Sequence, residues 1–363
     1  MNSGASAHAA NAPVLIMAGG TGGHIFPGIA VAQALRARDV PVLWLGSEGG
    51  LETRLVPQAG IALETIAISG VRGKGLATLF GAPLKVVRAL LAAWRLIGAT
   101  RPRSVLSMGG YVAGPGGIAA WLRGVPLIVH EQNSVPGTTN RILARLARRR
   151  LCGFEGALAN SEWIGNPVRA EIAALAPPAE RLAGRSPPAR LLVLGGSQGA
   201  RALNNVMPAA LARMPAGERP QVRHQCGGKL ADEARAAYAR AAVDASIEPF
   251  IDDMAAAYAW ADLVVCRAGA LTIAELCAVG IGAVLVPFPA AVDDHQTRNA
   301  VWMADHGAAI LAPENQAGAE FVAGLLRILE DRSALSGMAQ AARALAKRDA
   351  AANIATICMQ VAA

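Results

Sequence analysis

Cysteine and aromatic residues are scarce in this sequence, and long hydrophobic runs are missing from it. The five cysteines are scattered over 363 residues with no pair at CxxC spacing, which disfavours a disulfide framework or a zinc site and fits a reducing, cytosolic location. No run of about 18 uncharged apolar residues occurs, so we expect no spanning helix. The first residues lack a basic segment followed by an apolar core, so we expect no signal peptide. Any contact with a membrane is therefore expected at its surface.

Basic residues are plentiful and unevenly distributed. Residues 1–170 contain 17 Lys and Arg against 7 Asp and Glu, whereas residues 171–363 contain 17 against 19. A basic half binds an anionic partner, and composition does not choose among nucleic acid, an acidic membrane and phosphate groups. The length and the 53% of apolar residues fit two domains with a core each.

Short apolar segments alternate with helical segments along the chain. We expect strands at residues 14–17, 42–45, 104–107, 127–130, 190–194, 263–266 and 283–286. Such alternation is typical of a parallel sheet with helices on both faces, and the pattern starts twice, at residues 14 and 190. The sequence therefore predicts two α/β halves with a boundary near residues 165–169. Residues 1–12 are expected to be disordered, and a last helix is expected over about residues 334–363.

Each half opens with a strand, a glycine-rich loop and a helix. The loops are Gly-Gly-Thr-Gly-Gly-His at residues 19–24 and Gly-Gly-Ser-Gln-Gly at residues 195–199. Backbone N–H groups and the helix dipole at such a turn favour a phosphate, although either loop alone also fits a structural tight turn. No Walker A lysine follows, and counting from Gly20 and Gly22 the third glycine of a dinucleotide fingerprint would fall at Ile25. Two loops at matching positions predict a phosphate-lined cleft.

Polar residues stand where such a cleft would need them. His24 ends the first loop at a helix start and is a candidate general base, unless it only bonds its own turn. Glu275 follows the strand at residues 263–266 and is a candidate partner of ribose or sugar hydroxyls; the alternative is a first-turn carboxylate that complements the helix dipole. Asn166 and Arg169 stand near the expected boundary. For Asp-Asp-His-Gln at residues 293–296, a solvated loop is favoured over a metal site.

Eight motifs follow one another along the chain. They are GGTGGH (19–24), SGVRGK (69–74), MGGY (108–111), HEQN (130–133), GNPVR (165–169), GGSQGA (195–200), FIDDM (250–254) and DDHQ (293–296). Together they closely resemble the MurG family of peptidoglycan N-acetylglucosaminyltransferases, over roughly residues 13–350. The resemblance implies an α/β protein of the GT-B fold, with two Rossmann-like domains facing across a cleft. It implies an N-terminal acceptor- and membrane-binding domain (13–168), a C-terminal UDP-sugar-binding domain (169–345) and a C-terminal helix (346–363) that packs back on the N-terminal domain.

The resemblance also implies an activity. The family transfers N-acetylglucosamine from UDP-N-acetylglucosamine to the 4-hydroxyl of MurNAc in undecaprenyl-pyrophosphoryl-MurNAc-pentapeptide (lipid I). The product is lipid II for peptidoglycan synthesis, and the anomeric configuration inverts. Such a hexosyltransferase uses no cofactor and acts peripherally at the cytoplasmic face of the inner membrane, in cell wall biogenesis, cell shape and cell division. The expected partners are the donor, lipid I, an anionic membrane surface and other cell-wall synthesis and division proteins, with no nucleic acid.

By resemblance, the donor-binding residues come from both halves. His24 is implied as catalytic, either as a base or in orienting the acceptor. Glu275 is implied to hold ribose hydroxyls, the backbone of Ile251 to read the uracil edge, Ser197 to meet the diphosphate and Gln296 to hold sugar hydroxyls. The full donor-binding set, which contains no metal ligand, is Thr21, Gly22, Gly23, Asn133, Arg169, Ser197, Ile251, Ala270, Leu271, Thr272, Ile273, Ala274, Glu275 and Gln296.

Basic and apolar residues are interleaved in two stretches of the N-terminal half. After Arg72 and Lys74, large apolar residues recur at helical spacing over residues 76–97 with Lys85, Arg88 and Arg95 between them, and residues 141–150 hold five arginines. The pattern is typical of a basic amphipathic helix at a membrane surface, and a core helix with a solvated basic face is the alternative. Given the charge of this half, we expect both stretches to face anionic lipid.

Three other functions stay open on the sequence. A different GT-B enzyme would use a UDP-sugar with another acceptor. A UDP-sugar epimerase shares the fold class and some motifs. A non-catalytic nucleotide-binding scaffold of the wall-synthesis machinery is disfavoured because both His24 and Glu275 are present.

Overall fold

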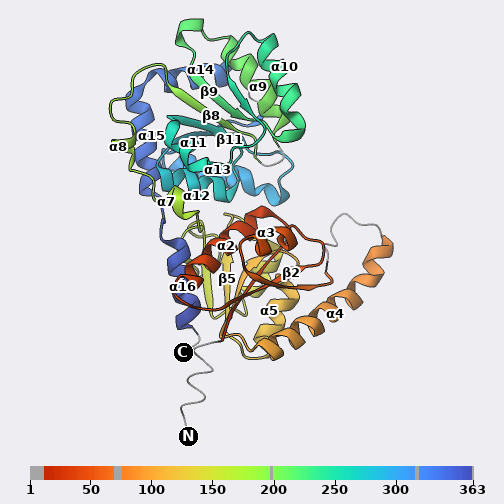
Figure 1. The fold of residues 1–363 in the computed structure, drawn as a ribbon. Coiled ribbons are helices and arrows are strands. Elements are labelled where there is room, and N and C mark those ends of the chain that lie inside the picture. Colours follow the sequence, from red (N-terminus) through yellow and green to blue (C-terminus); the bar gives the residue numbers. More distant parts are fainter. Residues whose placement is uncertain (1–11, 69–75, 197–198, 315–318, 362–363) are drawn as a thin grey trace. The chain divides into compact units, whose positions relative to one another are not determined.

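The computed structural model describes residues 12–68, 76–196, 199–314 and 319–361 (Figure 1). Residues 1–11 of the segment expected to be disordered, the motif at residues 69–74 with Arg72 and Lys74, and Ser197 lie outside the described residues. The chain divides into two compact units: Met1–Val168 together with Arg348–Ala363, and Arg169–Lys347. Each unit is a parallel sheet packed with helices, which confirms the expected fold class.

The first unit is built on a seven-stranded parallel sheet in the order β3-β2-β1-β4-β5-β6-β7. Its strands are β1 (Val14–Ala18), β2 (Val42–Ser47), β3 (Ala62–Ile66), β4 (Ser104–Gly109), β5 (Leu127–Glu131), β6 (Arg149–Cys152) and β7 (Glu162–Trp163). Its helices are α2 (Gly22–Arg36), α3 (Glu52–Gln58), α4 (Leu76–Thr100), α5 (Ala113–Leu122), α6 (Thr138–Leu143) and α16 (Ala350–Gln360).

Strand β1 is buried on both faces, and its alternate residues enter two different cores. Val14 and Ile16 pack in a cluster with residues of α2 and α16, including Ile354. Leu15 and Met17 pack in a second cluster with residues of α4 and α5. Because side chains alternate along a strand, the uninterrupted apolar run of β1 reflects helices on both sides of the sheet.

The second unit is built on a six-stranded parallel sheet in the order β10-β9-β8-β11-β12-β13. Its strands are β8 (Arg190–Leu194), β9 (Gln221–Gln225), β10 (Ser246–Glu248), β11 (Leu263–Cys266), β12 (Gly282–Leu285) and β13 (Ala309–Leu311). Its helices are α7 (Ala170–Ala173), α8 (Pro178–Arg181), α9 (Arg201–Ala212), α10 (Ala231–Arg240), α11 (Met254–Trp260), α12 (Ala270–Val279), α13 (His295–Asp305), α14 (Ala319–Glu330) and α15 (Arg332–Ala344), with short 3₁₀ helices at Ala216–Glu218, Gly228–Leu230 and Val292–Asp294.

In both sheets the strand order reverses beside the strand that leads into a glycine loop. Strand β1 lies between β2 and β4, and β8 lies between β9 and β11. In open parallel sheets the carboxyl ends of the strands at such a switch point form the ligand crevice. Both glycine loops therefore lie where their unit is expected to bind a ligand.

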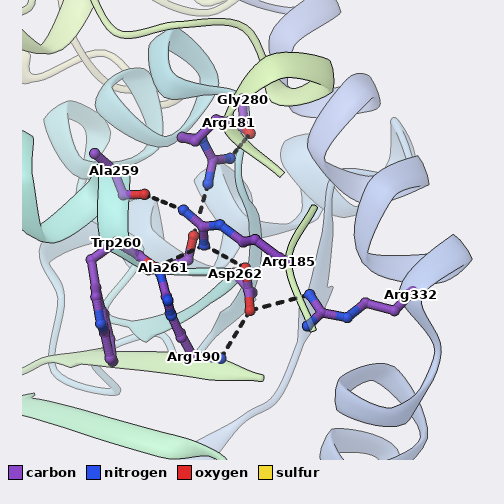
Figure 2. Close-up of polar contacts among 9 residues, drawn as sticks. All are labelled: Arg181, Arg185, Arg190, Ala259, Trp260, Ala261, Asp262, Gly280 and Arg332. Carbon is purple, nitrogen blue, oxygen red and sulfur yellow. Dashed lines mark hydrogen bonds and ion pairs between the residues drawn. The ribbon is translucent and has the colours of Figure 1, made fainter. Parts of the chain in front are cut away.

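A cluster of arginines fastens the segment after α8 to the rest of the second unit (Figure 2). Asp262, 1% exposed, pairs with Arg185 and Arg332 and accepts a hydrogen bond from the Arg190 N–H at 2.9 Å. Arg185 also donates to the carbonyls of Ala259 and Trp260 at the end of α11. Helix ends leave carbonyls without intrahelical partners, and Arg185 supplies the missing donors here.

The C-terminal segment differs from the single helix expected over residues 334–363. It forms two helices, α15 and α16, with a break at residues 345–349. Helix α15 packs on α12 in the second unit, whereas α16 packs on α2 in the first. The break falls where the chain passes from one unit to the other, between Lys347 and Arg348, which is a tertiary constraint that helical periodicity does not report. In the part of the chain that the structure describes, no helix is both long and apolar enough to cross a membrane.

Candidate functional site

The first glycine loop joins β1 to α2 at the carboxyl edge of the first sheet. Thr21 precedes the helix with an extended backbone, and Gly22 and Gly23 are its first two residues. Thr21 and Gly23 are exposed. These three residues present N–H groups at the amino end of a 15-residue helix, where the dipole favours a partial or full negative charge.

His24 lies in the first turn of α2, with its ring turned back to the loop. Its Nδ1 lies 3.3 Å from the Gly19 carbonyl oxygen and 3.5 Å from Thr21 Oγ1. When Nδ1 carries the proton and donates to Gly19, the lone pair is on Nε2, which is the form that accepts a proton. The bond to its own loop, which was the alternative to a catalytic role, is therefore compatible with either role.

Two glycines of the MGGY motif pack directly on this loop. Gly110 has φ +88°, and a Cβ there would collide with the Gly19 carbonyl oxygen. A Cβ on Gly109, which has φ +110°, would lie 3.1 Å from the His24 ring. Both the backbone conformation and the space require glycine here, so the motif after β4 shapes the surroundings of His24.

Glu52 is a buried carboxylate beneath the first loop that the sequence reasoning missed. It is 0% exposed; its Oε1 accepts bonds from the Ser47 N–H at 2.8 Å and the Ser47 hydroxyl at 2.6 Å, and its Oε2 accepts from the Gly20 N–H at 3.2 Å. The carboxylate therefore occupies a donor that a bound phosphate would otherwise use. The available signal was a glutamate at the start of a short helix, five residues beyond the end of a strand.

The HEQN motif lies at the end of β5 and is largely structural. Burial lowers the pKa of His130 to about 4, and the neutral ring bonds to the Gly165 carbonyl at 2.9 Å and to Gln132 at 3.0 Å. Glu131 accepts a bond from the Asn133 N–H at 3.0 Å, which fixes the backbone of the predicted donor residue. Asn166 donates to the Gln132 carbonyl. The motif thus joins the end of β5 to the segment after β7 and holds Asn133 in place.

Glu275 and Arg169 meet in the second unit. Arg169 Nε and Nη2 donate to Glu275 Oε1 at 3.2 and 3.0 Å, and the Tyr258 hydroxyl donates to Glu275 Oε2 at 3.0 Å. Glu275 is the sixth residue of α12, not a first-turn residue, so the alternative reading as a carboxylate that complements the helix dipole is wrong. Two residues that stand 106 positions apart in the sequence therefore form one polar site.

Burial and these partners act on Glu275 in opposite directions. Burial raises the pKa of the carboxyl, and the Arg169 guanidinium and the Tyr258 hydroxyl oppose that rise. Burial, with the neighbouring Glu275, raises the pKa of Tyr258 well above its usual range, so its hydroxyl stays a donor. The site presents a part-buried carboxylate with its acceptor oxygens held in fixed directions.

Apart from Ser197, which lies outside the described residues, the other predicted donor residues of the second unit lie in segments that follow β10, β11 and β12. Ile251 is buried and follows β10, between the exposed Phe250 and the start of α11. Gln296 lies in the first turn of α13, and its Oε1 accepts from the Phe288 N–H at 2.9 Å. The residues that form the first turns of α12 after the Gly269 N-cap are Ala270, Leu271, Thr272, Ile273 and Ala274.

The DDHQ motif forms a short 3₁₀ helix and the start of α13, not an irregular loop. Within residues 12–68, 76–196, 199–314 and 319–361, no three His, Cys, Asp or Glu side chains gather closely enough to hold a metal ion.

Family models match both units of the chain. The glycosyltransferase family 28 N-terminal domain matches residues 14–151, and the glycosyltransferase family 28 C-terminal domain matches residues 190–354.

Individual relatives match over nearly the whole chain. A UDP-N-acetylglucosamine--N-acetylmuramyl-(pentapeptide) pyrophosphoryl-undecaprenol N-acetylglucosamine transferase of Xanthomonas campestris pv. campestris (strain 8004) is 62% identical over 361 residues, which are 98% of this chain and 84% of the relative. A protein of the same name from Xylella fastidiosa (strain M12) is 58% identical over 96% of each chain.

Solved structures agree with these matches. The crystal structure of Acinetobacter baumannii MurG superposes with a TM-score of 0.85 at 39% identity, covering 96% of this chain and 99% of that one. The glycosyltransferase SnogD from Streptomyces nogalater superposes with a TM-score of 0.60 at 19% identity, covering 95% and 99%, and at that identity the likeness concerns the fold alone.

Proposed function

The chain belongs to glycosyltransferase family 28, and from that premise we propose that it transfers N-acetylglucosamine from UDP-N-acetylglucosamine to the MurNAc 4-hydroxyl of lipid I. The observation that carries the proposal is the 62% identity to a transferase of that name over 98% of the chain. The product is lipid II, and the reaction is a single inverting displacement in peptidoglycan synthesis.

The second unit binds the donor in this proposal. The Glu275 carboxylate accepts bonds from the two ribose hydroxyls, in an orientation that Arg169 and Tyr258 set beforehand. The backbone of Ile251 reads the uracil edge, and Gln296 holds sugar hydroxyls. Ser197 and its loop meet the diphosphate, together with Arg169 and the amino end of α12. Thr21, Gly22, Gly23 and Asn133 complete the donor contacts from the first unit.

His24 is the general base in this proposal. Nδ1 donates to the Gly19 carbonyl, and Nε2 takes the proton from the acceptor hydroxyl as its oxygen attacks the anomeric carbon. The bond from that carbon to the β-phosphate oxygen breaks, and UDP leaves with the electron pair. The leaving charge is stabilised by helix amino ends and arginine, without a cofactor.

The activity is tested with labelled UDP-N-acetylglucosamine and a lipid I analogue. Disaccharide formation is expected, and His24→Ala is expected to lower kcat by about 10²–10⁴-fold. The matched control is His306→Ala, an exposed histidine outside the proposed site. Epimerised free sugar would instead identify an epimerase, disaccharide on another acceptor a different transferase, and unreacted donor a non-catalytic scaffold.

Helix α4 carries the membrane contact in this proposal. Leu84, Val87 and Leu91 are 56%, 50% and 49% exposed at helical spacing, and Lys85 and Arg88 are exposed beside them. The opposite side of α4 contributes Ala89, Ala93 and Ile97 to the core. A solvated basic face alone would not expose three large apolar side chains, so this distribution favours the amphipathic reading.

The arginines of residues 141–150 contribute unequally. Arg149 pairs with Glu162 at 2.6 Å, and Arg150 and Arg141 donate to backbone carbonyls. Arg145 and Arg148 are exposed. We therefore assign Arg145 and Arg148, with the α4 surface, to the anionic lipid at the cytoplasmic face of the inner membrane, where the lipid-linked acceptor resides and where other wall-synthesis and division proteins are expected partners.

Vesicle binding tests this assignment. Each basic residue near an anionic surface contributes about 1 kcal/mol, so Lys85→Gln with Arg88→Gln is expected to weaken binding to phosphatidylglycerol-containing vesicles about 30-fold at low salt. Arg235→Gln with Arg240→Gln removes two exposed charges of the second unit as the control. Equal vesicle affinity of the two double variants would refute the α4 assignment.

A further inference from the structure

The side chain of Gln225 joins two segments of the second unit that the proposed function assigns to different parts of the donor. Gln225 is the last residue of β9, which lies between β8 and β10 in the sheet. It is 4% exposed. The glycine loop follows β8, and the segment that contains Pro249 and Ile251 follows β10.

The amide of Gln225 uses both of its ends. Its Oε1 accepts from the Gly196 N–H at 3.0 Å, and its Nε2 donates to the Gly196 carbonyl at 3.0 Å and to the Pro249 carbonyl at 3.2 Å. The main-chain oxygen of Gln225 also accepts from the Gly195 N–H at 2.9 Å. One residue therefore fixes the backbone of the glycine loop in two places and the backbone before Ile251 in a third.

The chemistry of this position calls for a primary amide. Gly196 presents a donor and an acceptor to the same side chain, and Pro249 presents a second acceptor. Glutamate supplies acceptors only and methionine supplies neither strong donor nor strong acceptor, although both have nearly the size of glutamine. A buried backbone carbonyl without a donor is costly. After replacement of Gln225, the backbones of Gly196 and Pro249 must therefore find other donors, and each shifts independently of the other.

The sheet around Gln225 has its own supports. The Cys226 N–H donates to the Glu248 carbonyl at 2.9 Å, and Arg223 forms two bonds to the Glu248 carboxylate at 2.9 and 3.1 Å. Asn204 of α9 donates to the Cys226 carbonyl at 3.1 Å. These contacts hold β9 against β10 and α9 without the Gln225 side chain, so the fold is expected to tolerate its replacement.

We propose that Gln225 is a positioning residue that sets the spacing between the diphosphate-binding loop and the uracil-reading backbone of the donor site. The proposal rests on the proposed function, since that function assigns the loop to the diphosphate and Ile251 to the base. Loss of Gln225 would then do two things at once: it weakens nucleotide binding, and it lowers the preference for uracil because the Ile251 backbone no longer faces the base edge correctly.

The experiment is calorimetric titration of the full chain with UDP and CDP. For Gln225→Met we expect a UDP Kd raised tenfold or more and a CDP-to-UDP Kd ratio that falls severalfold toward one. Gln225→Glu, which keeps the shape and loses the donors, is expected to do the same and serves if the methionine variant does not fold. Gln221→Met, an exposed residue on the same strand, is the control and should behave as wild type.

The outcomes separate the two proposals. A wild-type protein that does not prefer UDP to CDP contradicts the proposed function. A wild-type preference that Gln225→Met and Gln225→Glu both retain overturns the role of Gln225 alone. A purely structural role would lower the thermal midpoint and the fraction of binding-competent protein, yet leave the Kd ratio at its wild-type value, and that result would also overturn the proposal.

Discussion

At the scale of single residues, Tyr258 fixes one of the two oxygens of the Glu275 carboxylate. It is 1% exposed, and its hydroxyl donates to Glu275 Oε2 at 3.0 Å, whereas Arg169 donates to Oε1. A hydrogen bond to a charged group contributes about 1.5–3 kcal/mol. We expect Tyr258→Phe to raise the UDP Kd about tenfold or more, as measured by calorimetry.

The matched control for this prediction is Tyr238→Phe. Tyr238 is equally buried in the same unit, but its hydroxyl lies 2.9 Å from His224 and not near Glu275. An equal effect of both substitutions on UDP affinity would mean that Tyr258 acts through stability and not through Glu275.

Two buried histidines make stability depend on pH. Burial lowers the pKa of His130 and of His224 to about 4, so both are neutral in the folded chain at pH 7. In the unfolded chain these histidines take up protons near pH 6.5, whereas in the folded chain they stay neutral until about pH 4. Their contribution to the free energy of unfolding is therefore complete above pH 6.5 and is lost as pH falls toward 4. The loss reaches about 3 kcal/mol for each histidine, since one pKa unit corresponds to about 1.4 kcal/mol.

Urea unfolding between pH 7 and pH 4 measures this effect. His130→Gln and His224→Gln should each reduce the fall in the free energy of unfolding between pH 7 and pH 4. Replacement of the exposed His306 by Gln should leave that fall unchanged. A decline of the same slope in all three variants would assign the acid sensitivity to other groups.

Sequence reasoning proposed candidate site residues where they stand beside a glycine loop or after a strand end. His24 and Glu275 were proposed because strand, loop and helix follow one another within a few residues, whereas Thr21 was implied only by the family resemblance. Glu52, Tyr258 and Gln225 were not, because each acts through a contact made across the sheet or from another helix. Such contacts depend on strand order, and the order of parallel strands is not encoded in local periodicity.

At the scale of secondary-structure elements, Asp262 holds together the segment after α8, the start of β8 and the start of α15. The buried carboxylate binds Arg185, Arg332 and the Arg190 N–H (Figure 2). Removing one partner of a buried ion pair leaves uncompensated charge and costs about 3–5 kcal/mol. We expect Asp262→Ala to lower the free energy of unfolding of the second unit by that amount.

Chemical denaturation checks this prediction, with Asp232→Ala as the control. Asp232 forms an exposed ion pair with Arg235 on α10, and exposed pairs contribute little. A loss for Asp262→Ala no larger than for Asp232→Ala would show that the carbonyl contacts of the arginines hold the segment without the carboxylate.

Element boundaries show the limits of local patterns. The strand at residues 190–194 and that at residues 263–266 were predicted with the observed bounds, because each is a buried apolar run between turn residues. The two helices of residues 332–360 were predicted as one, because the sequence between them contains neither proline nor glycine. Their separation follows from the partners on which they pack.

At the scale of the whole molecule, the C-terminal helix is a structural part of the first unit. Ile354 is 0% exposed and belongs to the same core cluster as Val14 and Ile16 of β1. Ile→Ala at a fully buried site costs about 2–5 kcal/mol. We expect Ile354→Ala to lower the midpoint temperature of the first unit's unfolding transition and to leave that of the second unit unchanged.

Differential scanning calorimetry with and without UDP assigns the transitions, because a ligand raises the transition of the unit that binds it. Asn353→Ala, an exposed neighbour on α16, is the control. A shift of the second unit's transition instead of the first unit's would contradict the role given to α16.

The return of α16 to the first unit has a consequence for biosynthesis. The second unit is one continuous stretch, Arg169–Lys347, whereas the first unit takes its final helix from residues that follow that stretch. At about 5–20 residues per second, a ribosome needs roughly 10–40 s to make the intervening chain. During that time the core around Ile354 lacks a helix. The unit that is translated first is therefore completed last, and part of its apolar core stays uncovered until α16 has been synthesised.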